Sequence, residues 1–184
     1  PLRPWNITRL NTGSPSGRPA SFPYSAIYAT ITDPNYISLG PTNFVEAIFP
    51  PSTVDCTIKW NTYFEEPYNI VVPCTGSQSH GKWSMEVLKS TNTSEDWNPP
   101  SPTRNFGLRF RLEEAVVMNE GRVVTLVYVG EGIFSVGLNL DFVCGGSGVC
   151  SSGLKARPGG GGDRSVAITQ ELVETKVRCI DATC

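Results

Sequence analysis

The sequence predicts an all-β fold, either an antiparallel β-sandwich or a β-barrel stapled by disulfides, and three observations carry this prediction. Short segments in which apolar and polar side chains alternate with a period of two recur along the chain. The 184 residues include 18 glycines and 15 prolines, which favour frequent turns over long helices. The six cysteines include no CxxC metal-binding pair, and an even number of this kind is typical of disulfides in an oxidising compartment.

The first part of the chain contains three predicted strands after a polar opening segment. Residues 1–22 are rich in Pro, Gly, Ser and Asn, so we expect an irregular arm with at most one short strand. Residues 26–32 alternate and end at the turn-forming Asp33-Pro34-Asn35. Residues 44–49 are a second apolar stretch, and residues 54–60 show the clearest two-residue period in the chain.

Five further strands follow along the rest of the chain. They are predicted over residues 69–72, 82–88, 106–112, 122–129 and 133–144. The Gly130-Glu131-Gly132 segment predicts a short turn that joins the last two of these strands as a hairpin.

Two segments leave their secondary structure open. Residues 113–119 either continue the preceding strand or form a helical turn. Residues 166–179 fit neither period; their β-branched content favours a strand, with a helix over residues 169–176 as the alternative. We expect a single domain, residues 1–184, with a mobile Gly-rich loop at about residues 145–165.

The cysteines fall into three pairs that are close in sequence. Six cysteines allow 15 connectivities, and proximity favours the local ones. A bridge across the first pair would stabilise the fold by about 3 kcal/mol on the chain-entropy estimate. The predicted disulfides are Cys56–Cys74, Cys144–Cys150 and Cys179–Cys184.

Composition and motifs indicate an extracellular protein. Two N-glycosylation sequons, beginning at Asn6 and Asn92, agree with the disulfide prediction for a secreted chain. The formal net charge of −2 gives no field to attract nucleic acid. No apolar run approaches the roughly 18–20 residues of a membrane helix. We therefore predict a secreted protein with no membrane span and no nucleic-acid partner.

The sequence offers little material for catalysis, and we expect the protein not to be an enzyme. His80 is the one histidine, and no GxSxG motif supplies a serine nucleophile beside it. The couples Glu65-Glu66 and Glu113-Glu114 would each point to opposite faces of a strand, so neither is a glycosidase pair by itself. An acid/base pair drawn from two distant strands stays open. No metal site and no cofactor are predicted.

Aromatic residues in turn-rich regions are the predicted binding residues. Exposed aromatic rings on loops held by a rigid scaffold often mark binding sites for sugars or proteins. The alternative is that these rings fold back and cap the ends of the barrel. The residues are Tyr63, Phe64, Tyr68 and Trp97.

A series of short motifs resembles a group of small secreted fungal proteins. The motifs are Trp5-Asn6-Ile7-Thr8, Pro15-Ser16-Gly17-Arg18-Pro19, Ile31-Thr32-Asp33-Pro34-Asn35, Cys56 within a strand that ends at Trp60, Pro73-Cys74, and a late strand ending at Cys144. Their order is similar to that in the Alternaria major-allergen family and in fungal elicitors of plant cell death. The resemblance implies a secreted β-barrel or β-sandwich and implies no catalytic residues.

The expected function is that of a secreted, non-catalytic binding protein, a fungal effector or elicitor that acts on plant host tissue. Its partner would be a host protein or a cell-wall carbohydrate, and the chain would act as a monomer or homodimer. The alternatives are a secreted carbohydrate-binding or carbohydrate-active protein and a structural protein of the fungal cell wall.

Overall fold

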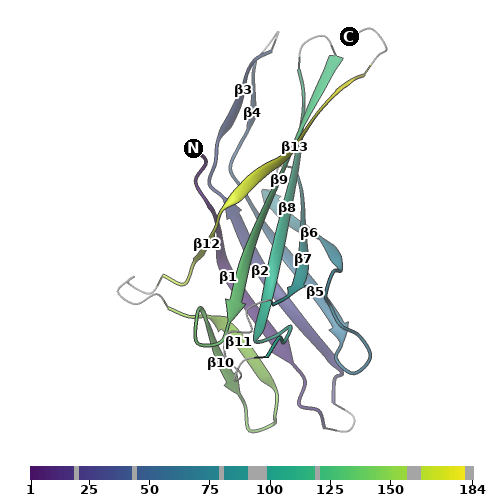
Figure 1. Ribbon diagram of the computed structural model, residues 1–184, viewed down its shortest axis with the longest axis vertical. Helices are drawn as coiled ribbons and strands as arrows, with labels where there is room; N and C mark the ends of the chain where they lie inside the picture. The colour runs from purple at the N-terminus through teal and green to yellow at the C-terminus, as the bar shows by residue number, and fades with distance from the viewer. Residues whose placement is uncertain are drawn as a thin grey trace.

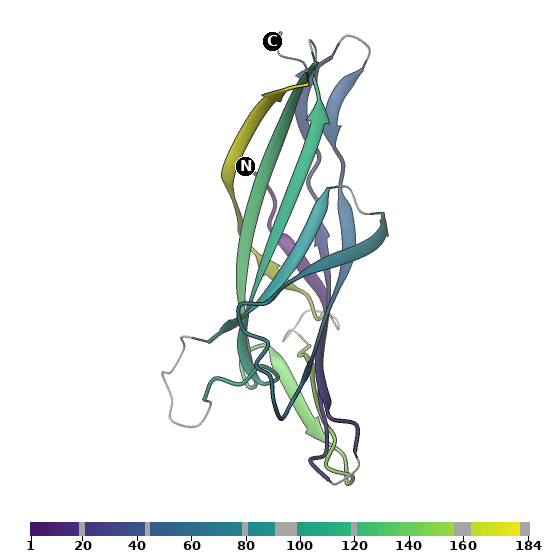
Figure 2. The ribbon, with the colours of Figure 1, turned by 90° about the vertical axis from the view of Figure 1, so that its right-hand side faces the viewer.

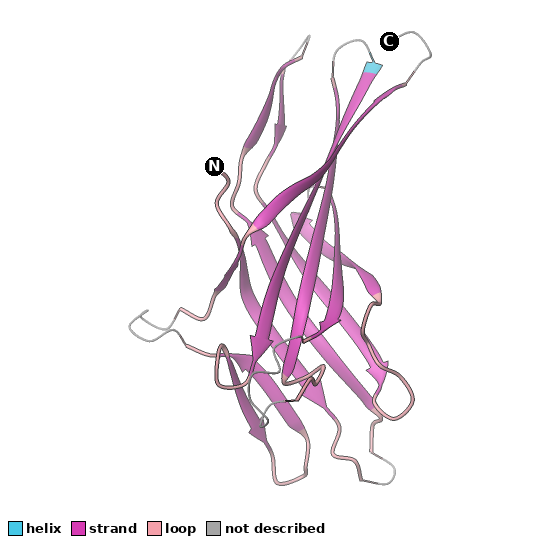
Figure 3. Cartoon of the chain, in the orientation of Figure 1, coloured by secondary structure: helices cyan, strands magenta, loops and turns pink. Residues whose placement is uncertain are grey.

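The computed structural model describes residues 1–18, 21–42, 45–78, 81–90, 99–118, 121–156 and 163–180. These residues are arranged mostly in β-strands, as Figure 3 shows. In chain order the strands are β1 (Trp5–Ser14), β2 (Tyr24–Asp33), β3 (Ile37–Pro41), β4 (Glu46–Phe49), β5 (Ser52–Asn61), β6 (Val71–Gln78), β7 (Lys82–Lys89), β8 (Asn105–Val117), β9 (Arg122–Ser135), β10 (Leu140–Cys144), β11 (Cys150–Leu154), β12 (Val166–Ile168) and β13 (Gln170–Cys179).

Most of the strands belong to one large sheet. Its order is β10-β11-β1-β2-β5-β6-β7-β8-β9-β13, and β12 joins it beside β1. The ladders between these strands are antiparallel. The sheet curls into a half-barrel, which Figures 1 and 2 show from two directions. The predicted all-β, antiparallel fold class is confirmed, in its barrel-like form.

One nearly continuous segment at the end of the chain pairs with two different parts of the curled sheet. β12 pairs with the start of β1, whereas β13, which begins two residues later, pairs with β9. Two glycines of β9 permit this approach, because a Cβ at Gly130 or Gly132 would lie 2.9 Å from an atom of Ile168. The segment therefore brings β1 and β9 close together.

The interior of the curled sheet is filled with apolar side chains. The alternation along each strand sends every second residue inward, and each large aliphatic or aromatic side chain buried in this way contributes roughly 1.5–3 kcal/mol. The rings of Trp5 on β1 and Trp83 on β7 meet across the interior with their centroids 4.7 Å apart, and those of Phe106 and Phe134, which are paired on the neighbouring strands β8 and β9, are 5.9 Å apart. The largest side chains that are fully buried are Trp5, Phe106, Phe110, Phe134, Ile7, Leu10, Ile27, Ile31, Met85, Leu108, Leu112 and Leu140.

Two groups of strands extend beyond this core at the same end of the molecule. The β3–β4 hairpin is a separate two-stranded sheet, and the ends of β8, β9 and β13 rise near it at the top of Figure 1. Ala47 and Phe49 of β4 are buried, and β4 contacts β8. The hairpin is therefore packed onto the core at its base.

Three local expectations are corrected by the structure. The opening segment is not an irregular arm, because β1 is a ten-residue strand paired with β2, β11 and β12. The predicted turn at Gly130-Glu131-Gly132 is wrong, because β9 runs through it. These glycines serve the close approach of Ile168 rather than a reversal of the chain. The apolar run 133–144 is consequently divided between β9 and β10.

The two segments left open are strands. β8 continues to Val117, and β12 and β13 occupy most of residues 166–179. Part of the stretch expected to be a Gly-rich loop is also a strand, since β11 covers Cys150–Leu154 and pairs with both β10 and β1. Residues 157–162 of that stretch lie outside the described residues.

Candidate functional site

Two of the three predicted disulfides are present. Cys56 and Cys74 are paired across β5 and β6 with their Cα atoms 4.3 Å apart, and Cys144 and Cys150 are paired across β10 and β11 at 4.0 Å. Cys184, the predicted partner of Cys179, lies outside the described residues. None of the described cysteines is a free thiol. The bridges tie neighbouring strands of the same sheet, so they strengthen the sheet locally.

The two members of each adjacent glutamate couple have different surroundings. Glu113 points outward and forms an ion pair with Arg111 at 2.9 Å, whereas its neighbour Glu114 points inward and is buried. Glu65 lies in the turn after β5, where its Oε2 accepts a hydrogen bond from the Asn61 N–H at 2.8 Å, and Glu66 is exposed beside it. His80 lies outside the described residues.

The outward arginines of β8 are neutralised by carboxylates. Arg109 contacts Glu86 at 2.8 Å and Glu131 at 2.6 Å, and Arg111 contacts Glu113. Hydrogen bonds to the Glu131 carboxylate are the main cause of a raised pKa at Arg109. Among the described residues, no cluster of three or more His, Cys, Asp or Glu side chains could hold a metal ion.

A buried group of polar residues, here called the acid cluster, lies at the base of the β3–β4 hairpin. It consists of Asp33, Asn35, Glu114 and Tyr128, all of which are less than a tenth exposed. The Asp33 carboxylate accepts hydrogen bonds from the backbone N–H of Asn35 at 2.8 Å and from its side-chain amide at 2.6 Å. Within the described structure, Oε2 of Glu114 has no hydrogen-bond partner.

Burial shifts the ionisation of both carboxyl groups in the acid cluster. Desolvation, assisted by the charge of Asp33, raises the pKa of Glu114 to about 8. Desolvation also raises the pKa of Asp33, although the Asn35 hydrogen bonds oppose the shift. The Trp5 indole lies near enough to lower the pKa of Asp33 slightly, without forming a hydrogen bond of good geometry. Glu114 is therefore largely protonated at neutral pH.

Hydrogen bonds connect the acid cluster to both ends of the chain. The Asn35 side chain accepts from the Arg3 N–H at 2.8 Å and donates to the Arg3 carbonyl at 2.9 Å. Gln170 accepts from the Trp5 N–H at 3.2 Å and donates to the same Arg3 carbonyl at 2.7 Å. The cluster thus fixes the N-terminal segment between the end of β2 and the start of β13.

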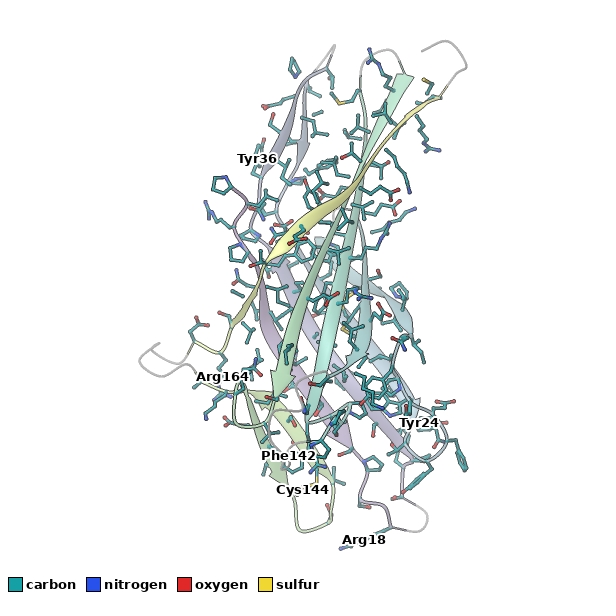
Figure 4. The ribbon with its side chains drawn as sticks, in the orientation of Figure 1. Arg18, Tyr24, Tyr36, Phe142, Cys144 and Arg164 are labelled. Carbon is teal, nitrogen blue, oxygen red and sulfur yellow. A yellow bond between two sulfur atoms is a disulfide. The ribbon has the colours of Figure 1, made fainter. Side chains whose placement is uncertain are left out.

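The opposite end of the molecule carries exposed aromatic rings, here called the aromatic end. Tyr63 and Phe64 lie in the turn after β5 and are 52% and 86% exposed, with the Asn61 side chain accepting a hydrogen bond from the Tyr63 N–H. Phe22, Tyr24 and Tyr28 lie on or just before β2 and are 65%, 44% and 43% exposed. Figure 4 shows Tyr24 near this end of the molecule.

The predicted binding residues are therefore not equivalent. Tyr63 and Phe64 are exposed as expected, but Tyr68 is partly buried against the core with the Lys89 ammonium 6.0 Å from its ring centre. Trp97 lies outside the described residues, as does the sequon residue Asn92. Asn6, the other sequon residue, is partly exposed on β1.

Two hollows lie at the aromatic end of the molecule. One, of about 300 Å³, is lined by Glu65, Tyr68 and Lys89 among other residues. The other, of about 290 Å³, lies over the outward face of β2 and is here called the β2 groove. Its lining residues are Gly13, Ser14, Pro15, Ser16, Ser21, Phe22, Tyr24, Ala26, Tyr28, Lys59 and Val149.

Sequence reasoning missed both the acid cluster and the β2 groove. A signal for Glu114 was available, because it continues the inward series Phe110 and Leu112 in a strand of period two. No comparable signal marks the groove, since Lys59 and the β2 tyrosines are brought together only by the pairing of β5 with β2.

The molecule belongs to the class of disulfide-linked, all-β proteins with a filled interior and an aromatic end. Comparison with models of known families, with curated proteins and with solved structures finds no match to the chain. Among the described residues there is no helix with the length and apolar character of a membrane span.

Proposed function

We propose that this protein is a secreted binding protein that works without catalysis, and that it contacts its partner through the aromatic end. The observation that carries the proposal is the exposure of five aromatic side chains around the first half of β2 and the turn after β5. Exposed rings on a rigid scaffold lose little conformational entropy when they bind, so they give affinity to a preformed surface.

One feature supports an extracellular setting for this activity, and another supports recognition at the outer surface. Disulfides persist in oxidising compartments, and two of them link neighbouring strands of the sheet. The interior of the sheet is filled by side chains such as Phe106, Phe110 and Phe134, which favours recognition at the outer surface over enclosure of a ligand.

The more specific proposal is an effector or elicitor that acts on plant host tissue, and its support is the resemblance carried by the sequence motifs. The test is to infiltrate purified protein into leaves of several plant species and to measure defence responses and tissue retention of labelled protein. We expect a response and retention for the natural sequence and their loss in the double variant Tyr63→Ser/Phe64→Ser.

The matched control is Tyr36→Ser, because Tyr36 is 60% exposed but lies in the other half of the molecule, as Figure 4 shows. Folded protein that neither remains in the tissue nor provokes a response in any species would contradict the effector proposal. Carbohydrate binding is the second candidate function, and the shape of the β2 groove favours it.

A further inference from the structure

The β2 groove has a floor of small residues between aromatic walls. Strand pairing places Gly13 of β1, Ala26 of β2 and Lys59 of β5 in one row across the sheet. Tyr24 and Tyr28 lie two residues to either side of Ala26 on the same face, about 13 Å apart along the strand. Since Gly13 has no side chain and Ala26 a short one, the space between the rings stays open.

Lys59 gives the groove a positive charge. Lys59 is exposed, and it makes no ion pair with any residue that the structure describes. Its ammonium lies 5.7 Å from the centre of the Phe22 ring, and the described residues that line the groove include no carboxylate. Ser14, Ser16 and Ser21 also line the groove. A partner with negative charge would therefore meet a cation that has no counterion among the described residues.

The strand beneath the groove disfavours an extended peptide as the occupant. β2 is paired with β1 on one side and with β5 on the other, so it offers no free edge for main-chain hydrogen bonds. A peptide therefore cannot add to the sheet here as an extra strand. A sugar ring instead turns a C–H face to an aromatic ring and keeps its hydroxyl groups at the rim.

We propose that the β2 groove binds a linear polysaccharide that carries carboxylate groups, with sugar rings stacked on Tyr24 and Tyr28 and a carboxylate beside Lys59. This inference rests on the proposed binding function and names the ligand class of the same end of the molecule. Aromatic rings give stacking that tolerates different sugars, and the lysine selects uronic-acid units over neutral ones by charge.

The test uses oligogalacturonides of about ten residues and, for comparison, neutral xylo-oligosaccharides of the same length, with binding measured by calorimetry at low salt. We expect the oligogalacturonides to bind more tightly than the neutral chains. Tyr28→Ala should weaken binding about tenfold and Lys59→Gln about fivefold, and only the Lys59 variant should lose most of the salt dependence.

A third variant blocks the groove without removing any contact. Gly13 has open space around the position of a Cβ and a φ that other residues adopt, so Gly13→Val fills the floor without strain. It should abolish oligogalacturonide binding while leaving the melting temperature of the protein unchanged. The controls are Tyr36→Ala and Lys82→Gln, which alter an exposed tyrosine and an exposed lysine outside the groove.

The possible results separate this inference from the proposed function. Oligogalacturonide binding that is weakened by the three groove variants supports the inference. Binding that the groove variants leave intact, or preference for the neutral chains, overturns it. If no oligosaccharide binds but plant tissue still retains the protein through Tyr63 and Phe64, the inference fails and the binding function stands. If neither occurs, both fail.

Discussion

The acid cluster and the aromatic end reverse the usual distribution of polar and apolar side chains. At the base of the β3–β4 hairpin, the carboxyl groups of Asp33 and Glu114 are buried, whereas Phe22, Tyr63 and Phe64 are exposed at the opposite end. Burying a carboxyl group costs solvation free energy, and leaving an aromatic ring in water forgoes the free energy that its burial would contribute. Both departures need an explanation outside the packing of the core.

The acid cluster and the aromatic end should respond differently to substitution. The acid cluster is connected by hydrogen bonds to Arg3 and is adjacent to the Trp5–Trp83 ring pair, so changes there alter the stability of the whole sheet. The aromatic rings project from a scaffold that does not depend on them. Substitutions at the acid cluster should therefore change stability, and substitutions at the aromatic end should change binding.

The largest expected effect is a dependence of stability on pH that comes from Glu114. Its pKa is about 8 in the folded protein and near the ordinary value of 4.5 in the unfolded chain. A raised pKa means that stability is fully present below about pH 4.5 and is lost as the pH rises toward 8. The loss amounts to about 4–5 kcal/mol, and Asp33, whose pKa is also raised, adds to it in the same direction.

Glu114→Gln should remove most of this dependence, because the glutamine does not ionise. The measurement is denaturant unfolding at about pH 5 and about pH 8.5, where the variant should show a much smaller difference than the natural protein. Glu113→Gln is the matched control, since Glu113 is the outward neighbour with a pKa lowered by the Arg111 hydrogen bond. Equal pH dependence in the natural protein and in Glu114→Gln would refute the buried-acid explanation.

The sequence predicts the strands of this fold better than it predicts the acid cluster and the β2 groove. Strands such as β2, β5 and β7 are visible in the sequence because alternation is a local property of a half-buried strand. The path of β9 through Gly130 and Gly132 is not visible, because its reason is the contact with Ile168 nearly forty residues away. The acid cluster and the β2 groove are likewise formed by residues of separate strands that come together only in the folded sheet. Neither therefore appears as a sequence motif.

The next largest effect should follow from removing the disulfide between β5 and β6. It closes a loop with a sequence separation of 18, whereas the Cys144–Cys150 bridge spans only 6. The chain-entropy estimate gives losses of about 3 and about 2 kcal/mol for the paired Cys→Ala replacements. Denaturant unfolding of the two double variants checks this order, and a greater loss at Cys144–Cys150 would contradict it.

A smaller loss is expected for Asn35→Ala at the acid cluster. Asn35 donates two hydrogen bonds to Asp33 and exchanges two with Arg3, so its truncation leaves a buried carboxylate with fewer donors. The backbone N–H of Asn35 remains in place, which limits the expected loss to about 2 kcal/mol at neutral pH. The loss should shrink as the pH falls through the raised pKa of Asp33 and its carboxylate becomes protonated in the folded state. A loss that grows on acidification would show that Asn35 does not act through Asp33.

The smallest effect on stability is expected at the aromatic end, and it completes the comparison. Phe64 is 86% exposed and its ring lies 6.5 Å from that of Tyr63, so replacing both with serine removes few contacts from the core. The free energy of unfolding should change by less than about 0.5 kcal/mol, as for other surface substitutions. Denaturant unfolding and the tissue assay on the same sample provide the decisive pair of measurements. Unchanged stability with lost retention assigns the exposed rings to binding, whereas a loss of stability near that of Asn35→Ala would mean that the rings support the sheet.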